Sequence, residues 1–287
     1  MNKFLLFIII SFFGFSYSYS QTNINTCDSS YTWLVNGNNY TSSGTYTASS
    51  DDNALSFDGT STFIQTNIPL STISSGGSSN EFTFSAWLMT NGSPNGYLQA
   101  FVASSSANFF IGLGHSGNNP YTQSPCGTGS SYLASFGTWF HYAYVVKAGS
   151  LEVYINGVSQ GSVSCSSTPS LTGDLLIGHE PEANGYYWNG EMDDVQVWNY
   201  GLTSQEIQNF MQCPPTGNES GLLAYYNFEE GTGMTALNQA SGNNGTISGN
   251  PSWTTNTFGN CPDTLNLILE ICGCTDPSAT NYDSNSI

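Results

Sequence analysis

Glu191, Asp193 and Asp194 place three carboxylates within a span of four residues. They lie in residues 191–198, a segment that is predicted to form a β-strand. Calcium binds about six to eight oxygen ligands, which an acidic, lysine-poor chain rich in Asn and Gly can supply. Because neighbouring strand residues point to opposite faces, at most one of Asp193 and Asp194 is expected to face such a site. We predict a Ca²⁺ site that includes Asp193 or Asp194. The alternative is that Asp193 accepts hydrogen bonds from a neighbouring loop.

Tyr186, Tyr187 and Trp188 form a second candidate site. They follow an Asn-Gly pair in a turn between two predicted strands, residues 174–178 and 191–198. Aromatic rings at such a position can stack on the apolar faces of sugar rings. The three residues are therefore predicted to bind a ligand, with Tyr186 the one most favoured to lie at the surface. The alternative for Tyr187 and Trp188 is that they begin the next strand and pack inward.

The elements that must position these residues follow a β pattern. Residues 139–146 are aromatic and β-branched, residues 151–155 alternate with period two, and residues 158–163 run back after the Asn156-Gly157 turn. One helix is predicted near residues 205–211, with Thr203 or Ser204 as its N-cap. The pattern predicts an all-β, antiparallel fold with one short helix.

The charge of the chain excludes one class of function. Its 287 residues include two lysines, no arginine and 20 acidic residues, so nucleic-acid binding is excluded because the chain lacks a cluster of cations.

Residues 1–20 have the charge, apolar run and small residues of a signal peptide, and no other segment has the length of a membrane span. We expect a protein that is secreted or held at the cell surface. In that setting the seven cysteines predict disulfides, and we pair Cys126 with Cys165 and Cys213 with Cys261.

Five segments in order resemble the LamG-like jelly-roll family of the concanavalin A-like lectin/glucanase superfamily. They are ALSFDG, FTFSAWL, WFHYAYVVKAGSLEVYINGVSQGSV, LLIG and WNGEMDDVQVWNYGLTSQEI, and the resemblance covers roughly residues 51–213. The resemblance implies a two-sheet antiparallel jelly-roll sandwich that most often serves as a secreted binding module. The side chains expected to point into its core are those of Leu151, Val153, Ile155, Val195 and Val197.

The resemblance also bears on the acidic residues. β-Glucanases of this superfamily carry a second glutamate four or five residues after the first on their active strand, but Val195 and Gln196 occupy those positions here. Retaining hydrolysis needs two carboxyl groups, so no enzyme activity is expected. In jelly rolls of this type the first and last strands lie side by side. That arrangement would bring Asp51, Asp52 or Asp58 near Asp193 and Asp194, where uncompensated carboxylates repel one another without a cation. The predicted metal residues are Asp58, Asp193 and Asp194.

The sequence predicts five segments. They are a signal peptide (1–20), a short repeat or spacer that resembles those of Bacteroidetes-type surface proteins (21–50), the jelly roll (51–213), an appended half-module (214–261), and a linker with a truncated Cys/Asn/Asp-rich repeat (262–287). The expected function is noncatalytic binding of a glycan, or of an extracellular matrix or surface protein. The alternatives are a structural, adhesive spacer of a larger surface protein, and a targeting appendage of a glycoside hydrolase domain that is missing here.

Overall fold

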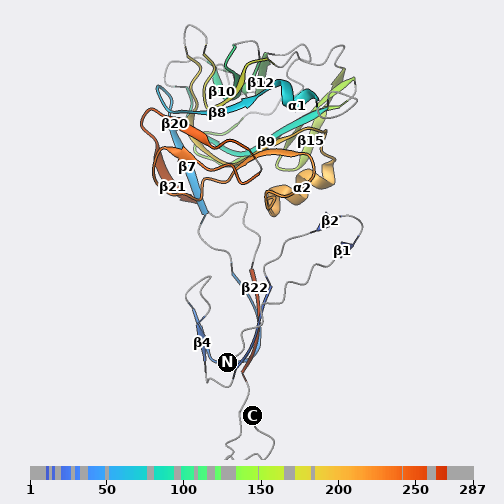
Figure 1. Ribbon diagram of the computed structural model, residues 1–287, viewed down its shortest axis with the longest axis vertical. Helices are drawn as coiled ribbons and strands as arrows, with labels where there is room; N and C mark the ends of the chain where they lie inside the picture. The colour runs from blue at the N-terminus through green and yellow to red at the C-terminus, as the bar shows by residue number, and fades with distance from the viewer. Residues whose placement is uncertain are drawn as a thin grey trace, which may run out of the picture. The chain divides into compact units, whose positions relative to one another are not determined.

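The computed structural model in Figure 1 consists mainly of β-strands. It describes residues 11–12, 15–16, 21–26, 30–32, 38–48, 52–75, 81–93, 98–106, 109–114, 120–123, 134–147, 149–164, 172–181, 185–240, 242–256 and 263–269. The chain divides into two units, one formed by Asp51–Gly259 and the other by Met1–Ser50 together with Asn260–Ile287. The larger unit contains both candidate sites.

Two antiparallel sheets form the larger unit, as the sequence predicts. The first has seven strands, in the order β12 (Pro120–Gln123), β11 (Phe110–Leu113), β10 (Gln99–Ser104), β16 (Asp174–Ile177), β8 (Phe63–Pro69), β20 (Gly245–Ser248) and β19 (Thr235–Ala236). The second has eight in the order β15 (Val158–Ser164), β14 (Ser150–Ile155), β13 (Phe140–Lys147), β9 (Phe82–Thr90), β17 (Asn189–Trp198), β7 (Asp52–Asp58) and β21 (Ser252–Asn256), with β18 (Leu222–Tyr226) also paired to β17. Figure 1 shows the two sheets as stacked layers.

The core lies between the two sheets because most of their strands turn apolar side chains toward the opposite sheet. In β8 the inward residues Ile64 and Ile68 are buried and alternate with the more exposed Phe63 and Gln65. The five side chains predicted to point into the core are all buried, which confirms the predicted orientation of β14 and β17: Leu151, Val153, Ile155, Val195 and Val197. Asn156 and Gly157 both have positive φ, at 49° and 74°, and form the predicted turn between β14 and β15.

Helix α2 (Ser204–Gln212) covers the outer face of the eight-stranded sheet, where Phe210 stacks on Trp198 with ring centroids 4.7 Å apart. The helix begins in a capping box. Thr203 accepts a hydrogen bond from the backbone N–H of Glu206, whose carboxylate accepts one from the backbone N–H of Thr203. The predicted helix and its N-cap are thus confirmed. A second helix that the sequence did not predict is α1 (Ser71–Ser75), so the described residues of the sandwich include two helices rather than one.

The smaller unit is built from both ends of the chain. Its strands are β1 (Ser11–Phe12) and β2 (Phe15–Ser16), which pair with each other, β4 (Tyr31–Thr32) and β5 (Asn39–Tyr40), which form a second pair, and a sheet of β3 (Gln21–Thr26), β22 (Asp263–Leu269) and β6 (Gly44–Ala48). Leu265 and Leu267 of β22 are buried against Ile24, Tyr46 and other apolar residues. The predicted spacer (21–50) and linker (262–287) therefore share one sheet and one small core.

The predicted boundary at residue 213 differs from the structure. Residues 214–261 were expected to form a separate half-module, but β18 to β21 from this segment are strands of the two sheets of the sandwich.

Cys213 is disulfide-bonded. Cys126, Cys165 and Cys261 lie outside the described residues, so both disulfide pairings stay predictions. The signal peptide also stays a prediction, because only four of its residues are described. Within the described parts of the chain, no helix combines the length and apolar character of a membrane span.

Candidate functional site

Strand β17 changes its neighbour at Asp193 and Asp194. Up to Met192 the strand pairs with β7, and from Val195 onward it pairs with β18. The register between β17 and β9 also shifts between Asp193 and Gln196, and Asp194 has φ of 51°, in the left-handed region that Asp tolerates better than most residues. This bulge interrupts the alternation of faces. Both aspartates can therefore contribute to one cluster, contrary to the expectation that only one of them would.

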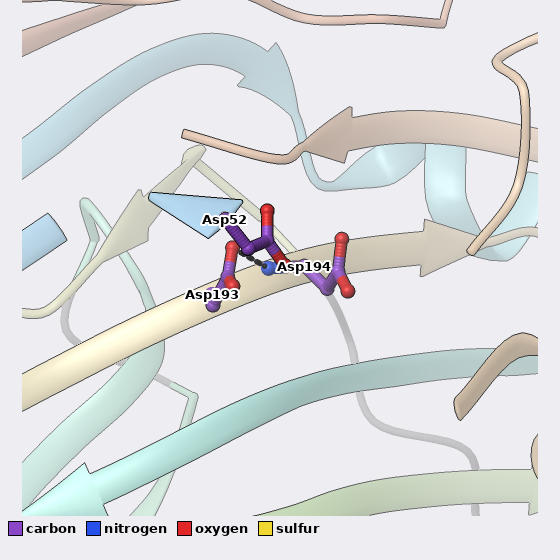
Figure 2. Close-up of side chains that lie close together, drawn as sticks. All are labelled: Asp52, Asp193 and Asp194. Carbon is purple, nitrogen blue, oxygen red and sulfur yellow. Dashed lines mark hydrogen bonds between the residues drawn. The ribbon is translucent and has the colours of Figure 1, made fainter. Parts of the chain in front are cut away.

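The cluster consists of Asp52, at the start of β7, together with Asp193 and Asp194. One carboxylate oxygen from each lies within 4.8 Å of the others. Figure 2 shows these three side chains gathered where β7 meets β17. All three are buried, with exposed fractions of 5%, 0% and 3%. The cluster takes Asp52 from β7, not the predicted Asp58, while Asp51 lies outside the described residues.

Hydrogen bonds hold these carboxylates in place but leave one oxygen without a partner. Asp193 accepts hydrogen bonds from the backbone N–H of Asp194, at 2.8 Å, and from the Asn256 side chain, at 2.9 Å. Asp194 Oδ1 accepts a hydrogen bond from the hydroxyl of Tyr225, at 2.6 Å. Asp194 Oδ2 is buried and has no hydrogen-bond partner in the described structure. A buried carboxylate oxygen without a donor is costly, and a bound cation is one kind of partner that would offset this cost.

A fourth carboxylate lies beside this group. Glu229 accepts hydrogen bonds from the backbone N–H and side-chain amide of Asn53, and its carboxyl group also contacts that of Asp52. Burial, the contact with Glu229 and repulsion from the two neighbouring aspartates raise the pKa of Asp52. Burial and repulsion from Asp194 raise the pKa of Asp193 well above its usual value. The geometry suits a divalent cation, whose charge would let the acids remain ionised.

Asp58 has a structural role instead. Its carboxylate accepts hydrogen bonds from the backbone N–H groups of Thr60, Ser61 and Thr62 and from the Ser61 hydroxyl. Burial alone would raise the pKa of Asp58, but these hydrogen bonds lower it below its usual range. The carboxylate thus stabilises the turn between β7 and β8.

Trp188 is a core residue, so its assignment to the ligand site needs correction. It is fully buried, and its indole N–H donates to the carbonyl of Met89 at 3.1 Å. Tyr187 lies outside the core and stacks on His179, with ring centroids 4.1 Å apart and planes 10° apart. Phe63 completes this group, its ring 5.0 Å from His179 and 6.3 Å from Tyr187. Burial lowers the pKa of His179 to about 4, so its ring is neutral at neutral pH.

Tyr186 lies between surface and core. It is partly buried, packs with Leu98 against a small apolar cluster, and its ring is 5.8 Å from that of Phe110. The predicted aromatic site is therefore divided: Trp188 points inward, Tyr186 packs beside β10 and β11, and Tyr187 joins Phe63 and His179.

Sequence reasoning missed Phe63. The alternation of residues 62–66 identifies it as facing away from Ile64, but no local pattern shows that it lies beside Tyr187.

Glu191 and Asp193 do not form an open pair of catalytic carboxylates. Glu191 is half-buried, and burial raises its pKa. Asp193 is fully buried and held by Asn256 and the backbone. A glycosidase needs both carboxyl groups exposed to the sugar, one on each side of the scissile bond. This strand does not offer that arrangement.

The comparisons with other proteins agree with the fold. Residues 58–208 match the family model described as the concanavalin A-like lectin/glucanases superfamily. A proposed carbohydrate-binding protein from Bacteroides ovatus ATCC 8483 superposes with a TM-score of 0.54 at 18% identity, over 74% of this chain and 61% of that one.

Two further structures superpose with lower scores. A heptameric pentraxin from Limulus polyphemus has a TM-score of 0.41 at 17% identity, over 78% of this chain and 98% of its own. Domain 4 of an extracellular arabinanase from Geobacillus stearothermophilus, in complex with arabinotriose, has a TM-score of 0.43 at 22% identity, over 54% and 75%.

Proposed function

Because this chain belongs to the concanavalin A-like lectin/glucanase superfamily, we propose that its sandwich is a noncatalytic extracellular module that binds carbohydrate. Fold by itself does not assign a function, so the proposal depends on a surface feature. That feature is the group of aromatic rings formed by Phe63, His179 and Tyr187. We call it the aromatic platform.

The aromatic platform suits a sugar because Phe63 and Tyr187 are only partly buried and keep ring surface available. Aromatic side chains give large contact areas at low conformational cost, and polar groups around them fix the orientation of a ligand. The absence of an exposed carboxylate pair on β17 supports binding without hydrolysis. The predicted signal peptide supports export, which would place the module where extracellular glycans occur.

A calcium ion is the second part of the proposal. Asp52, Asp193 and Asp194 would hold it, with Glu229 next to them. Asp194 Oδ2 supports this assignment, because it is a buried acceptor for which the described structure provides no donor. Calcium suits oxygen ligands of this kind. Its part would be to stabilise the junction of β7, β17 and β18 and so keep the sandwich in the form that binds the glycan.

Glycan-array binding by the purified chain, in the presence of calcium, tests the main proposal. We expect saturable binding to a subset of glycans and no release of reducing ends. A folded protein that binds none of them would contradict the proposal. It would favour a structural spacer or the recognition of an extracellular protein.

A further inference from the structure

We propose that the ligand is a neutral glycan, lying across the outer face of β8 and β20 with its rings against the aromatic platform. This inference rests on the proposed carbohydrate-binding function and adds the site and the ligand class. Three polar side chains on the same face would bind the sugar hydroxyls: Gln65, Thr246 and Ser248.

Strand pairing places these polar groups beside Phe63. In the β8–β20 pair, Ile64 is opposite Ile247 and both are buried in the core. The neighbouring pairs must then face outward, namely Phe63 with Ser248 and Gln65 with Thr246. Directly opposite side chains on a sheet lie about 5 Å apart, which is the scale of one sugar ring. An aromatic surface and a polar row thus lie side by side.

These polar groups are available to a ligand. Thr246 is exposed, and Gln65 and Ser248 are partly exposed. None of the three side chains makes a hydrogen bond to another residue in the described ranges. Together they offer an amide, which both donates and accepts, and two hydroxyls. Sugar hydroxyls also donate and accept, so the chemistry of the face matches a saccharide better than a purely apolar ligand.

The charge of this region favours a neutral sugar over an acidic one. Recognition of carboxylate or sulfate groups on a glycan relies on Arg or Lys. The chain has no arginine, and its one lysine in the described residues, Lys147, is on β13 in the other sheet. The His179 ring is neutral at neutral pH because burial lowers its pKa. Asp58, which precedes β8, is a carboxylate, and the whole chain carries a formal charge of −18. An anionic glycan would therefore meet repulsion without a compensating cation.

An array that pairs neutral oligosaccharides with their sialylated, sulfated or carboxylated derivatives tests the ligand class. We expect binding to neutral members and little to their acidic partners. Calorimetry with the best neutral oligosaccharide then tests the site. Phe63→Ala and Tyr187→Ala should each weaken binding by roughly tenfold, whereas Tyr187→Phe, which keeps the ring, should bind nearly as wild type does.

Gln65→Ala should also weaken binding, and Gln160→Ala on β15 of the other sheet is its matched control. Circular dichroism and thermal unfolding establish that each variant is folded. Equal binding of acidic and neutral partners would overturn the neutral ligand class while leaving the carbohydrate function intact. Neutral binding that is insensitive to Phe63→Ala, Tyr187→Ala and Gln65→Ala would overturn the site. Binding to no glycan at all would count against the proposed function itself.

Discussion

Asp194→Asn changes one atom of the carboxylate cluster and should have opposite effects with and without calcium. Asn can keep the hydrogen bond from Tyr225 through its oxygen, and it tolerates the positive φ of residue 194. Its amide nitrogen would replace Asp194 Oδ2, the oxygen that has no donor. The variant removes one negative charge and supplies a donor to the neighbouring carboxylates. Without metal it should be more stable than the wild type, and it should respond weakly to calcium.

The size of the effect follows from the separation of the acids. The carboxylate oxygens lie within 4.8 Å of one another, and two unit charges at that outer distance repel by about 3.5 kcal/mol at an effective dielectric constant of about 20. Protonation of one acid relieves part of this repulsion, so the net gain of the variant is smaller than the full Coulomb energy. In a unit of this size, 1 kcal/mol shifts the unfolding midpoint by about 2–4 °C. Asp194→Asn should therefore raise the midpoint by up to roughly 10 °C in chelator. The wild type should gain about 2.7 kcal/mol when calcium is at about one hundred times its Kd.

Differential scanning calorimetry near neutral pH, in EDTA and in millimolar calcium, measures both effects. Asp58→Asn is the control, since it removes an acid that lies outside the cluster. It should lower the midpoint equally in both buffers and leave the calcium response unchanged. A wild-type midpoint that is the same in calcium and in EDTA would refute the metal site. An Asp194→Asn variant that is less stable than wild type in EDTA would refute the assumed repulsion.

Three other outcomes are expected. Neither the wild type nor Glu191→Gln should release sugar from laminarin or mixed-linkage glucan. If the wild type did hydrolyse these glucans and Glu191→Gln did not, Glu191 would be catalytic. His141 is buried, and burial lowers its pKa from 6.5 to about 3, so the unfolded state binds a proton that the folded state does not. Stability is therefore fully present above pH 6.5 and falls as the pH drops toward 3. Denaturant titrations at about pH 7 and about pH 4 measure how much the free energy of unfolding falls between the two pH values. In His141→Phe this fall should be smaller by roughly 3 kcal/mol, and an unchanged pH dependence would show that His141 is not its cause. Thr203→Ala should cost about 1 kcal/mol through loss of the α2 N-cap, measured by the same titration, and no change would show that the cap contributes nothing.

Most of the fold could be predicted from local sequence patterns. The alternation in residues 151–155, the Asn156-Gly157 turn and the cap at Thr203 each depend on residues a few positions apart, so the sequence alone predicted them correctly. The same is true of the core positions Val195 and Val197. Their burial follows from strand periodicity once the identity of one face is known.

The features that local patterns did not predict depend on pairing between strands that are far apart in the sequence. Residues 214–256 belong to the sandwich because β18 pairs with β17, and because β20 and β21 pair with β8 and β7, strands from much earlier in the chain. Such distant partners leave no local signal in the sequence. Because neighbouring residues of a strand face opposite sides of the sheet, the sequence predicted that Asp193 and Asp194 would point away from each other. The switch of β17 from β7 to β18 allows the bulge that brings them together beside Asp52. Phe63 meets Tyr187 across more than one hundred residues of sequence for the same reason. Periodicity determines which way a side chain points, but only the order of strands in the sheets determines which side chain it meets.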